Sequence, residues 1–184
     1  MPLKPLSVDF TVSWRTHDSW SELYVGVRRL VYEILPVDIA SHRAEDSALC
    51  QLAVVGANSL MEVCLYKLLQ SYTADATKGL SPSKLDKASY ADMVKYLEST
   101  VGKPLDCSVQ PFISTEALRR RRHATVHKTS ALATGPMARS ALFSAVEGCR
   151  HLYAYVGQPF PWEAYLVDTP LGVERWFSDV SVPS

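Results

Sequence analysis

The sequence has little that marks an exported, membrane-spanning or metal-binding protein. Its first residues contain no apolar run of signal-peptide length, and no later window approaches the roughly 18 apolar residues of a membrane span. Its four cysteines lie far apart, without a C-x-x-C pair or a histidine at zinc-ligand spacing. We therefore expect a soluble cytoplasmic protein with reduced thiols, no structural metal, no cofactor and no membrane contact.

The sequence also lacks a charge excess, because 19 basic residues balance 19 acidic ones. This balance argues against coating nucleic acid through bulk electrostatics, so any contact with RNA must be local. The most concentrated basic feature is the run 119–122, four arginines that His123, His127 and Lys128 follow closely. Such a run is either a solvated helix face or a local anion-binding patch. Patterns for phosphate loops, dinucleotide folds, zinc proteases and hydrolase elbows do not occur.

Apolar residues recur at helical spacing in five segments. The predicted helices cover about residues 19–34, 48–70, 81–101, 114–128 and 136–156, and the second is apolar enough to be the central packing helix. A capping box from Ser19 to Glu22 marks the first start. The alternation Val8, Phe10, Val12 favours only an extended lead-in or a short edge strand. Five helices without a convincing strand pair predict an all-α fold, an antiparallel helical bundle.

The length suits one domain with an appendage. We expect the bundle to occupy residues 1–157 and a C-terminal extension to occupy residues 158–184. Cys64 and Cys149 fall within apolar stripes of the bundle, where a reduced cysteine acts as a small buried hydrophobe. The extension is too aromatic to be a free tail, so it is expected to pack on the bundle or on a partner subunit. Its prolines and aromatic residues include Pro159, Pro161, Trp162, Tyr165, Pro170, Trp176 and Phe177.

The stretch Arg122-His123-Ala124-Thr125-Val126-His127 has an arginine, a polar neighbour and then a histidine after four intervening residues. It follows a long apolar helix, which includes residues 54–62, and a further helix, and it precedes an alanine-rich final helix. In this setting the stretch resembles the signature of the HEPN family of helical domains. The resemblance covers about residues 45–157 and does not reach residues 158–184.

The resemblance implies a metal-independent endoribonuclease in which Arg122 and His127 form the catalytic pair at a dimer interface, with His123 as a polar auxiliary. Histidine titrates near neutrality and suits proton transfer, while arginine is a permanently charged, forked donor for phosphate. On an ideal helix His123 and His127 share a face, whereas Arg122 and His127 diverge by about 140°. Fraying of the helix, or a second copy across a two-fold axis, would relieve that divergence.

Several assignments stay open. Arg119, Arg120, Arg121 and Lys128 are expected to bind RNA, unless the run is only a solvated face. Glu62 either orients His127, pairs with an arginine, or is a solvated or salt-bridged glutamate. Some toxin members of the family carry a modifiable tyrosine two residues after the histidine. This chain has Thr129 there, so that form of control by an antitoxin is in doubt.

Two functions follow from these residues. The first is an RNA-cleaving enzyme that acts as a toxin or defence effector, with a cognate antitoxin as a further partner. The second is a non-enzymatic module of the same fold that dimerises or binds nucleotide or RNA. The enzyme is favoured, because both the arginine and the histidine are present where a binding module needs only positive charge.

Overall fold

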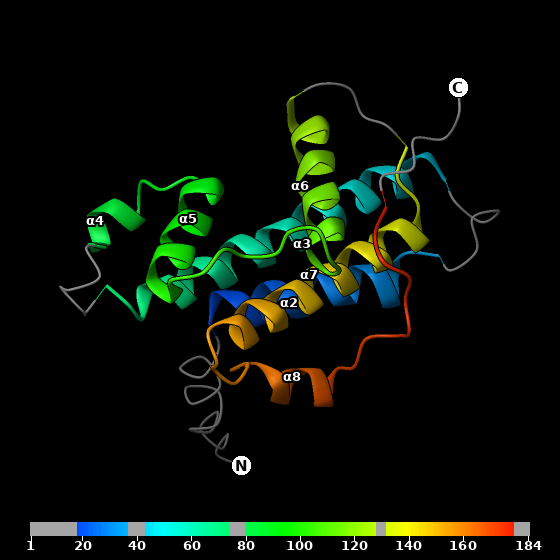
Figure 1. Cartoon of the computed structure of the whole chain (residues 1–184). Coiled ribbons are helices and arrows are strands. Elements are labelled where there is room, and N and C mark those ends of the chain that lie inside the picture. The colour runs from blue at the N-terminus through cyan, green and yellow to red at the C-terminus, as the bar shows by residue number, and fades with distance from the viewer. Residues whose placement is uncertain (1–17, 37–42, 74–79, 128–131, 179–184) are drawn as a thin grey trace, which may run out of the picture.

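The computed structural model describes residues 18–36, 43–73, 80–127 and 132–178, and the segment from Val8 to Val12 lies outside them. Within these ranges the chain is helical and has no strand, so the predicted all-α class is confirmed there. Figure 1 shows the arrangement of the elements. They are α2 (Ser19–Arg29), the π-helix η1 (Leu30–Ile34), α3 (Ala44–Gln70), α4 (Pro82–Leu85), α5 (Tyr90–Val101), α6 (Phe112–His127), α7 (Gly135–Tyr155) and α8 (Glu163–Asp168).

The two long helices α3 and α7 form the centre of the molecule and run in the same direction (Figure 1). Their contacts keep the same order along both segments. The Ala133 amide donates to Ser47 Oγ, the Cys149 thiol donates to the Leu60 carbonyl, and further along Gln158 donates to Tyr72. The expected antiparallel arrangement therefore does not hold for this pair. Both long helices are apolar on several faces, so the periodicity of each does not decide which neighbour it takes or in which direction.

Helix α2 runs against the direction of α3 and closes the other side of the core. Its cap is Asp18, whose Oδ1 accepts from the amides of Trp20 and Ser21 at 3.0 Å, so the capping box starts one residue before the predicted Ser19. The side chain of Val27 lies against Gly56 of α3, where a Cβ would approach Val27 Cγ2 to 2.6 Å. The close approach of α2 and α3 thus depends on a residue without a side chain.

The C-terminal extension packs on the same chain, chiefly against α2 and α7. The ring of Trp162 stacks on Trp20 at 4.5 Å, and the Tyr24 hydroxyl donates to the Thr169 carbonyl. Further along, the Phe177 amide donates to Ser144 Oγ at 2.8 Å. Aromatic stacking and these hydrogen bonds keep the extension folded back over the helices as far as residue 178.

Helix α3 is long and apolar enough to cross a membrane, by length and composition alone. An 18-residue window within Glu45–Gln70 reaches a mean hydropathy of 1.6, which corrects the expectation that no window approaches a span. Half of that window is buried inside the molecule. Cys64 of α3 and Cys149 of α7 are both fully buried, as predicted, and burial raises the pKa of the Cys64 thiol.

The predicted third helix is divided into α4 and α5. Helix α5 has its own capping box, in which the Asp92 amide donates to Ser89 Oγ and the Ser89 amide donates to Asp92 Oδ2. Because this serine takes the extended backbone of a cap, it cannot continue a helix from Leu85. The pattern Ser-x-x-Asp at residues 89–92 was present in the sequence and marks this second start.

Candidate active site

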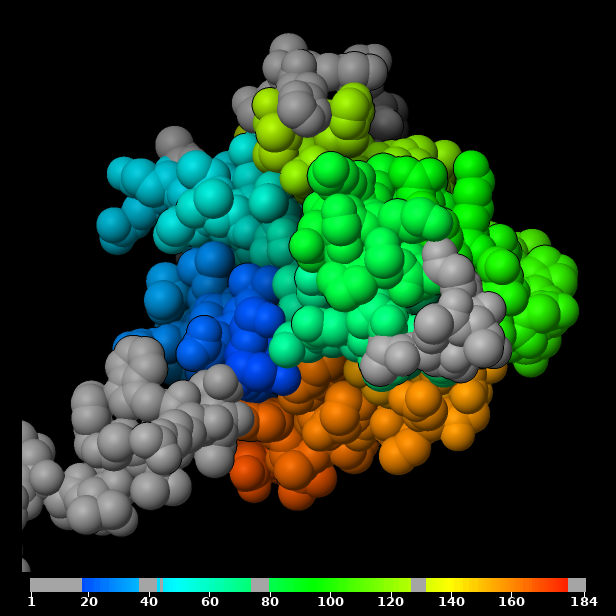
Figure 2. Space-filling view, turned by 90° about the vertical axis from the view of Figure 1, so that its left-hand side faces the viewer, coloured from blue at the N-terminus to red at the C-terminus, as the bar shows by residue number. Residues whose placement is uncertain are grey.

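The candidate site is the C-terminal half of α6, which crosses α3 and α7 steeply and rises away from them (Figure 1). The crossing is tight, because a Cβ on Gly148 of α7 would lie 2.6 Å from Met61 Sδ and 2.7 Å from Thr115 Cγ2 of α6. Near the crossing, Leu118 is fully buried, whereas Val126 in the last turn is half exposed. Figure 2 shows α6 at the edge of the molecule, above α3 and beside α5. The motif therefore lies on a helix that is anchored at one end and exposed at the other.

Helix α6 continues through His127 without a break. The helix is thus not frayed within the motif. Fraying was one of the two ways to bring Arg122 and His127 together. Over five residues of α-helix the two positions diverge by about 140°. His127 is the last residue of α6, its side chain lies outside the described part of the chain, and Lys128 lies outside it altogether.

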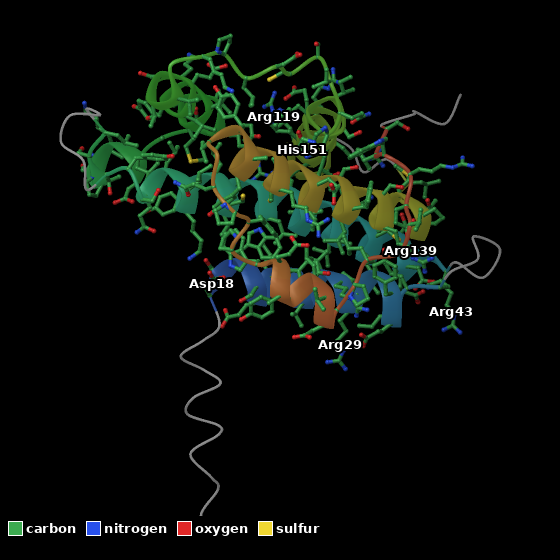
Figure 3. The ribbon with its side chains drawn as sticks, turned by 60° about the horizontal axis from the view of Figure 1, so that its bottom comes forward. Asp18, Arg29, Arg43, Arg119, Arg139 and His151 are labelled. Atoms are coloured by element: carbon green, nitrogen blue, oxygen red, sulfur yellow. The ribbon has the colours of Figure 1, made fainter. Side chains whose placement is uncertain are left out.

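The four arginines of the run are in different surroundings. Arg119 is exposed and makes a bidentate ion pair with Glu116, at 2.9 Å from Nε and 2.8 Å from Nη2. The hydrogen bonds from Arg119 lower the pKa of Glu116, and the same bonds raise the pKa of Arg119. Arg120 is exposed beside this pair. In Figure 3, Arg119 lies on the opposite side of the molecule from Arg29 of α2.

Arg121 is turned into the molecule and is only 6% exposed. Its Nη2 donates to the Leu132 carbonyl oxygen at 2.7 Å, eleven residues further along the chain. The guanidinium of Arg121 is thus engaged with the chain's own backbone. Arg121 is therefore a weaker candidate for RNA binding than the exposed Arg119 and Arg120. Any residue can supply a backbone carbonyl, so no sequence pattern predicts this partner of Arg121.

Arg122 is partly buried, and its Nε is buried without a hydrogen-bond partner among the described residues. No carboxylate within the described ranges forms an ion pair with it either. An unpaired buried donor costs about 1–3 kcal/mol, so a guanidinium in this state favours the arrival of an acceptor. His123, the next residue, is exposed. His123 and His127 lie one turn apart on the same face of α6.

Glu62 lies apart from the motif. Its Oε1 accepts from the amide of Asn58 at 2.9 Å, and it lines a cavity of about 310 Å³ between α2, α3 and α5. Ser19, Tyr66 and Lys67 line the same cavity, and none of its lining residues comes from α6. The structure thus brings Glu62 together with α2 and α5, and nothing in this arrangement connects it to Arg122.

The described residues contain no group of three or more His, Cys, Asp or Glu side chains placed to hold a metal ion. No protein-family model, curated protein or solved structure matches the chain. Helix α6 presents, within three turns, the guanidinium of Arg122 with no carboxylate partner in the described ranges, the exposed His123 and the exposed Arg119 and Arg120. Together these groups can bind a polyanion and transfer protons near neutral pH.

Proposed function

We propose that the chain is a metal-independent endoribonuclease of the HEPN type. In this proposal it works in the cytoplasm as a toxin or defence effector, and a cognate antitoxin is a further partner. The observation that carries the proposal is Arg122, a partly buried arginine with no carboxylate and no acceptor for its Nε among the described residues. A partly buried guanidinium with no carboxylate partner among the described residues is expected where an anion binds. The phosphate of RNA is such an anion.

The chemistry needs no group beyond those of the chain and the RNA. His127 takes the proton from the 2′-hydroxyl, whose oxygen attacks the adjacent phosphorus. Arg122 neutralises the charge that develops on the phosphoryl oxygens. The bond to the 5′-oxygen of the next nucleotide breaks, and that oxygen takes up a proton from a histidine. The products are one strand with a 2′,3′-cyclic phosphate and one with a 5′-hydroxyl. DNA lacks the attacking hydroxyl and stays uncut.

The unbroken helix supports a homodimer as the active form. Because Arg122 and His127 diverge by about 140° along α6, one chain presents them to different sides. A second copy related by a two-fold axis can place its histidine beside the first copy's arginine. Val126 in the last turn of α6 and Leu132 shortly before α7 are 50% and 75% exposed and offer apolar surface. Burying them between two copies would remove this surface from water.

The same observations favour one alternative, a non-enzymatic module that dimerises or binds RNA. In one chain Arg119 and Arg121 are already engaged with Glu116 and a backbone carbonyl. If binding is the whole function, Arg120 and the exposed apolar residues suffice, and no proton transfer is needed.

The test is incubation of the pure protein with a mixed RNA pool in EDTA, followed by analysis of the new ends. The proposal expects 2′,3′-cyclic phosphate and 5′-hydroxyl ends with the parent protein and their loss with His127→Ala. His151→Ala is the matched control, since His151 is an exposed histidine on α7 that should not affect cleavage. RNA that is bound but left intact by the parent protein would favour the non-enzymatic module.

A further inference from the structure

Four consecutive arginines on an α-helix point in four directions, about 100° apart. The run is therefore no single basic patch. Arg119 and Arg120 face solvent, while Arg121 is the most buried of the four and donates to the carbonyl of Leu132 at 2.7 Å. Charged side chains are seldom buried to this extent unless they make specific bonds.

The partner of Arg121 belongs to a fixed segment. Ala133, next to the accepting carbonyl, is 2% exposed, and its amide donates to Ser47 Oγ in the first turn of α3 at 3.3 Å. The following residue, Thr134, caps α7 with its hydroxyl. The accepting carbonyl is thus tied to the beginnings of both central helices. The bond from Arg121 connects the third turn of α6 to this point.

The other anchor of α6 is its crossing with the central helices at Thr115 and Gly148, near the start of α6. Beyond the crossing the helix rises away from α3 and α7 (Figure 1). The Arg121 bond holds this projecting half, and it lies one residue before Arg122. Packing of buried residues such as Leu118 holds the first two turns of α6, and the Arg121 bond extends this hold to the third turn.

We propose that Arg121 is a positioning residue, which fixes the direction of the last turns of α6 and thereby places Arg122 and His127. This inference rests on the proposed ribonuclease function for its catalytic consequence. Arginine suits the role because its long apolar stem packs in the interior while the planar guanidinium makes a charge-assisted bond to the carbonyl. Its charge is directed to the chain's own backbone, so Arg121 adds nothing to the binding of RNA.

The test compares Arg121→Met with Arg120→Met, which removes an exposed charge from the same run. Arg121→Met should lower the single-turnover cleavage rate at saturating enzyme about 10- to 100-fold, because small misplacements of catalytic groups have effects of this size. RNA affinity and its salt dependence should stay as in the parent. Arg120→Met should instead weaken RNA binding and keep the cleavage rate at saturating enzyme. The slope of log affinity against log salt concentration should become shallower by somewhat less than one.

Two further variants complete the set. Arg121→Lys keeps a donor and a charge and should recover part of the rate that Arg121→Met loses. Arg29→Met removes an exposed arginine on the opposite side of the molecule and should leave rate and affinity unchanged (Figure 3). A parent-like cleavage rate for Arg121→Met, or a loss of RNA affinity with a flatter salt dependence, would overturn the positioning role.

Hydrogen exchange separates this inference from the proposed function. If the parent protein cuts no RNA, the ribonuclease proposal fails, and exchange of the backbone amides of residues 122–127 still decides the role of Arg121. Faster exchange in Arg121→Met upholds the positioning role, and unchanged exchange refutes it. Ser47→Ala, which loosens the accepting segment without touching an arginine, should accelerate the same amides, and its failure to do so would also count against the inference.

Discussion

Gly148→Ala tests the packing that places α6 across the central helices. The new Cβ would lie 2.6 Å from Met61 Sδ, 2.9 Å from Met61 Cε and 2.7 Å from Thr115 Cγ2. Ordinary van der Waals contacts start near 3.4 Å, and both neighbours are almost completely buried. Overpacking of this kind costs about 1–3 kcal/mol. Replacing glycine by alanine within a helix also stabilises the fold by up to about 1 kcal/mol, because alanine has the higher helix propensity.

Gly26→Ala in α2 is the matched control, because a Cβ there meets nothing within 4 Å. The propensity gain is common to both variants, so the difference between their free energies of unfolding isolates the overpacking cost. We expect Gly148→Ala to be less stable than Gly26→Ala by about 1–3 kcal/mol in urea titrations followed by circular dichroism.

A third variant identifies the neighbour that is responsible. Adding Thr115→Ser to Gly148→Ala removes the clashing methyl group and keeps the hydroxyl that donates to the Phe112 carbonyl. The double variant should be more stable than the sum of the two single effects predicts, because the clash is absent from it. If Gly148→Ala is as stable as Gly26→Ala, the crossing has room for a side chain, and the account of how α6 is placed is wrong.

Three further predictions concern pH, assembly and metals. Burial raises the pKa of Asp18, but hydrogen bonds from Ser21 and Trp162 and the charge of Lys67 outweigh it and lower the pKa below its ordinary value. The Asp18 carboxylate therefore stabilises the fold at pH values above its pKa in the unfolded chain, and this contribution is lost as the pH falls through its pKa in the folded protein. The stability that Asp18→Asn loses at pH 6 should thus be smaller at pH 3, as measured by urea titrations. Light scattering should return a dimer at high micromolar concentration, and a 20.4 kDa monomer alone would count heavily against the shared site. RNA cleavage should survive chelation, and loss in EDTA with recovery on adding a divalent ion would contradict the metal-independent mechanism.

Helical periodicity was enough to predict α2, α3, α6 and α7 to within a few residues, since each buries a stripe against the core. It did not predict the parallel direction of α3 and α7. Apolar periodicity identifies the face that is buried and says nothing about the partner that covers it. The break between α4 and α5 was missed because the apolar spacing continues across it, although Ser89 and Asp92 mark a new cap.

The candidate site was located by its motif, but the roles within the arginine run depend on helix phase and on distant partners. Arg119 and Arg121 are two residues apart and so differ by about 200° around the helix, which puts one in solvent and the other in the interior. For Glu62 the sequence allows three roles: orienting His127, pairing with an arginine, or an ordinary solvated or salt-bridged glutamate. The structure shows that it lies on α3 in a cavity next to α2 and α5.

The central claim is that Arg122 and His127 cut RNA through its own 2′-hydroxyl. The most direct measurement is single-turnover cleavage of a short defined RNA at saturating enzyme, with circular dichroism to confirm folding. We predict that His127→Ala lowers the rate about 10²- to 10⁴-fold, that Arg122→Ala acts similarly, and that a substrate with one 2′-deoxynucleotide at the cut position stays intact there. A folded His127→Ala protein that cuts at the parent rate, or cleavage at the 2′-deoxy position, would contradict the claim.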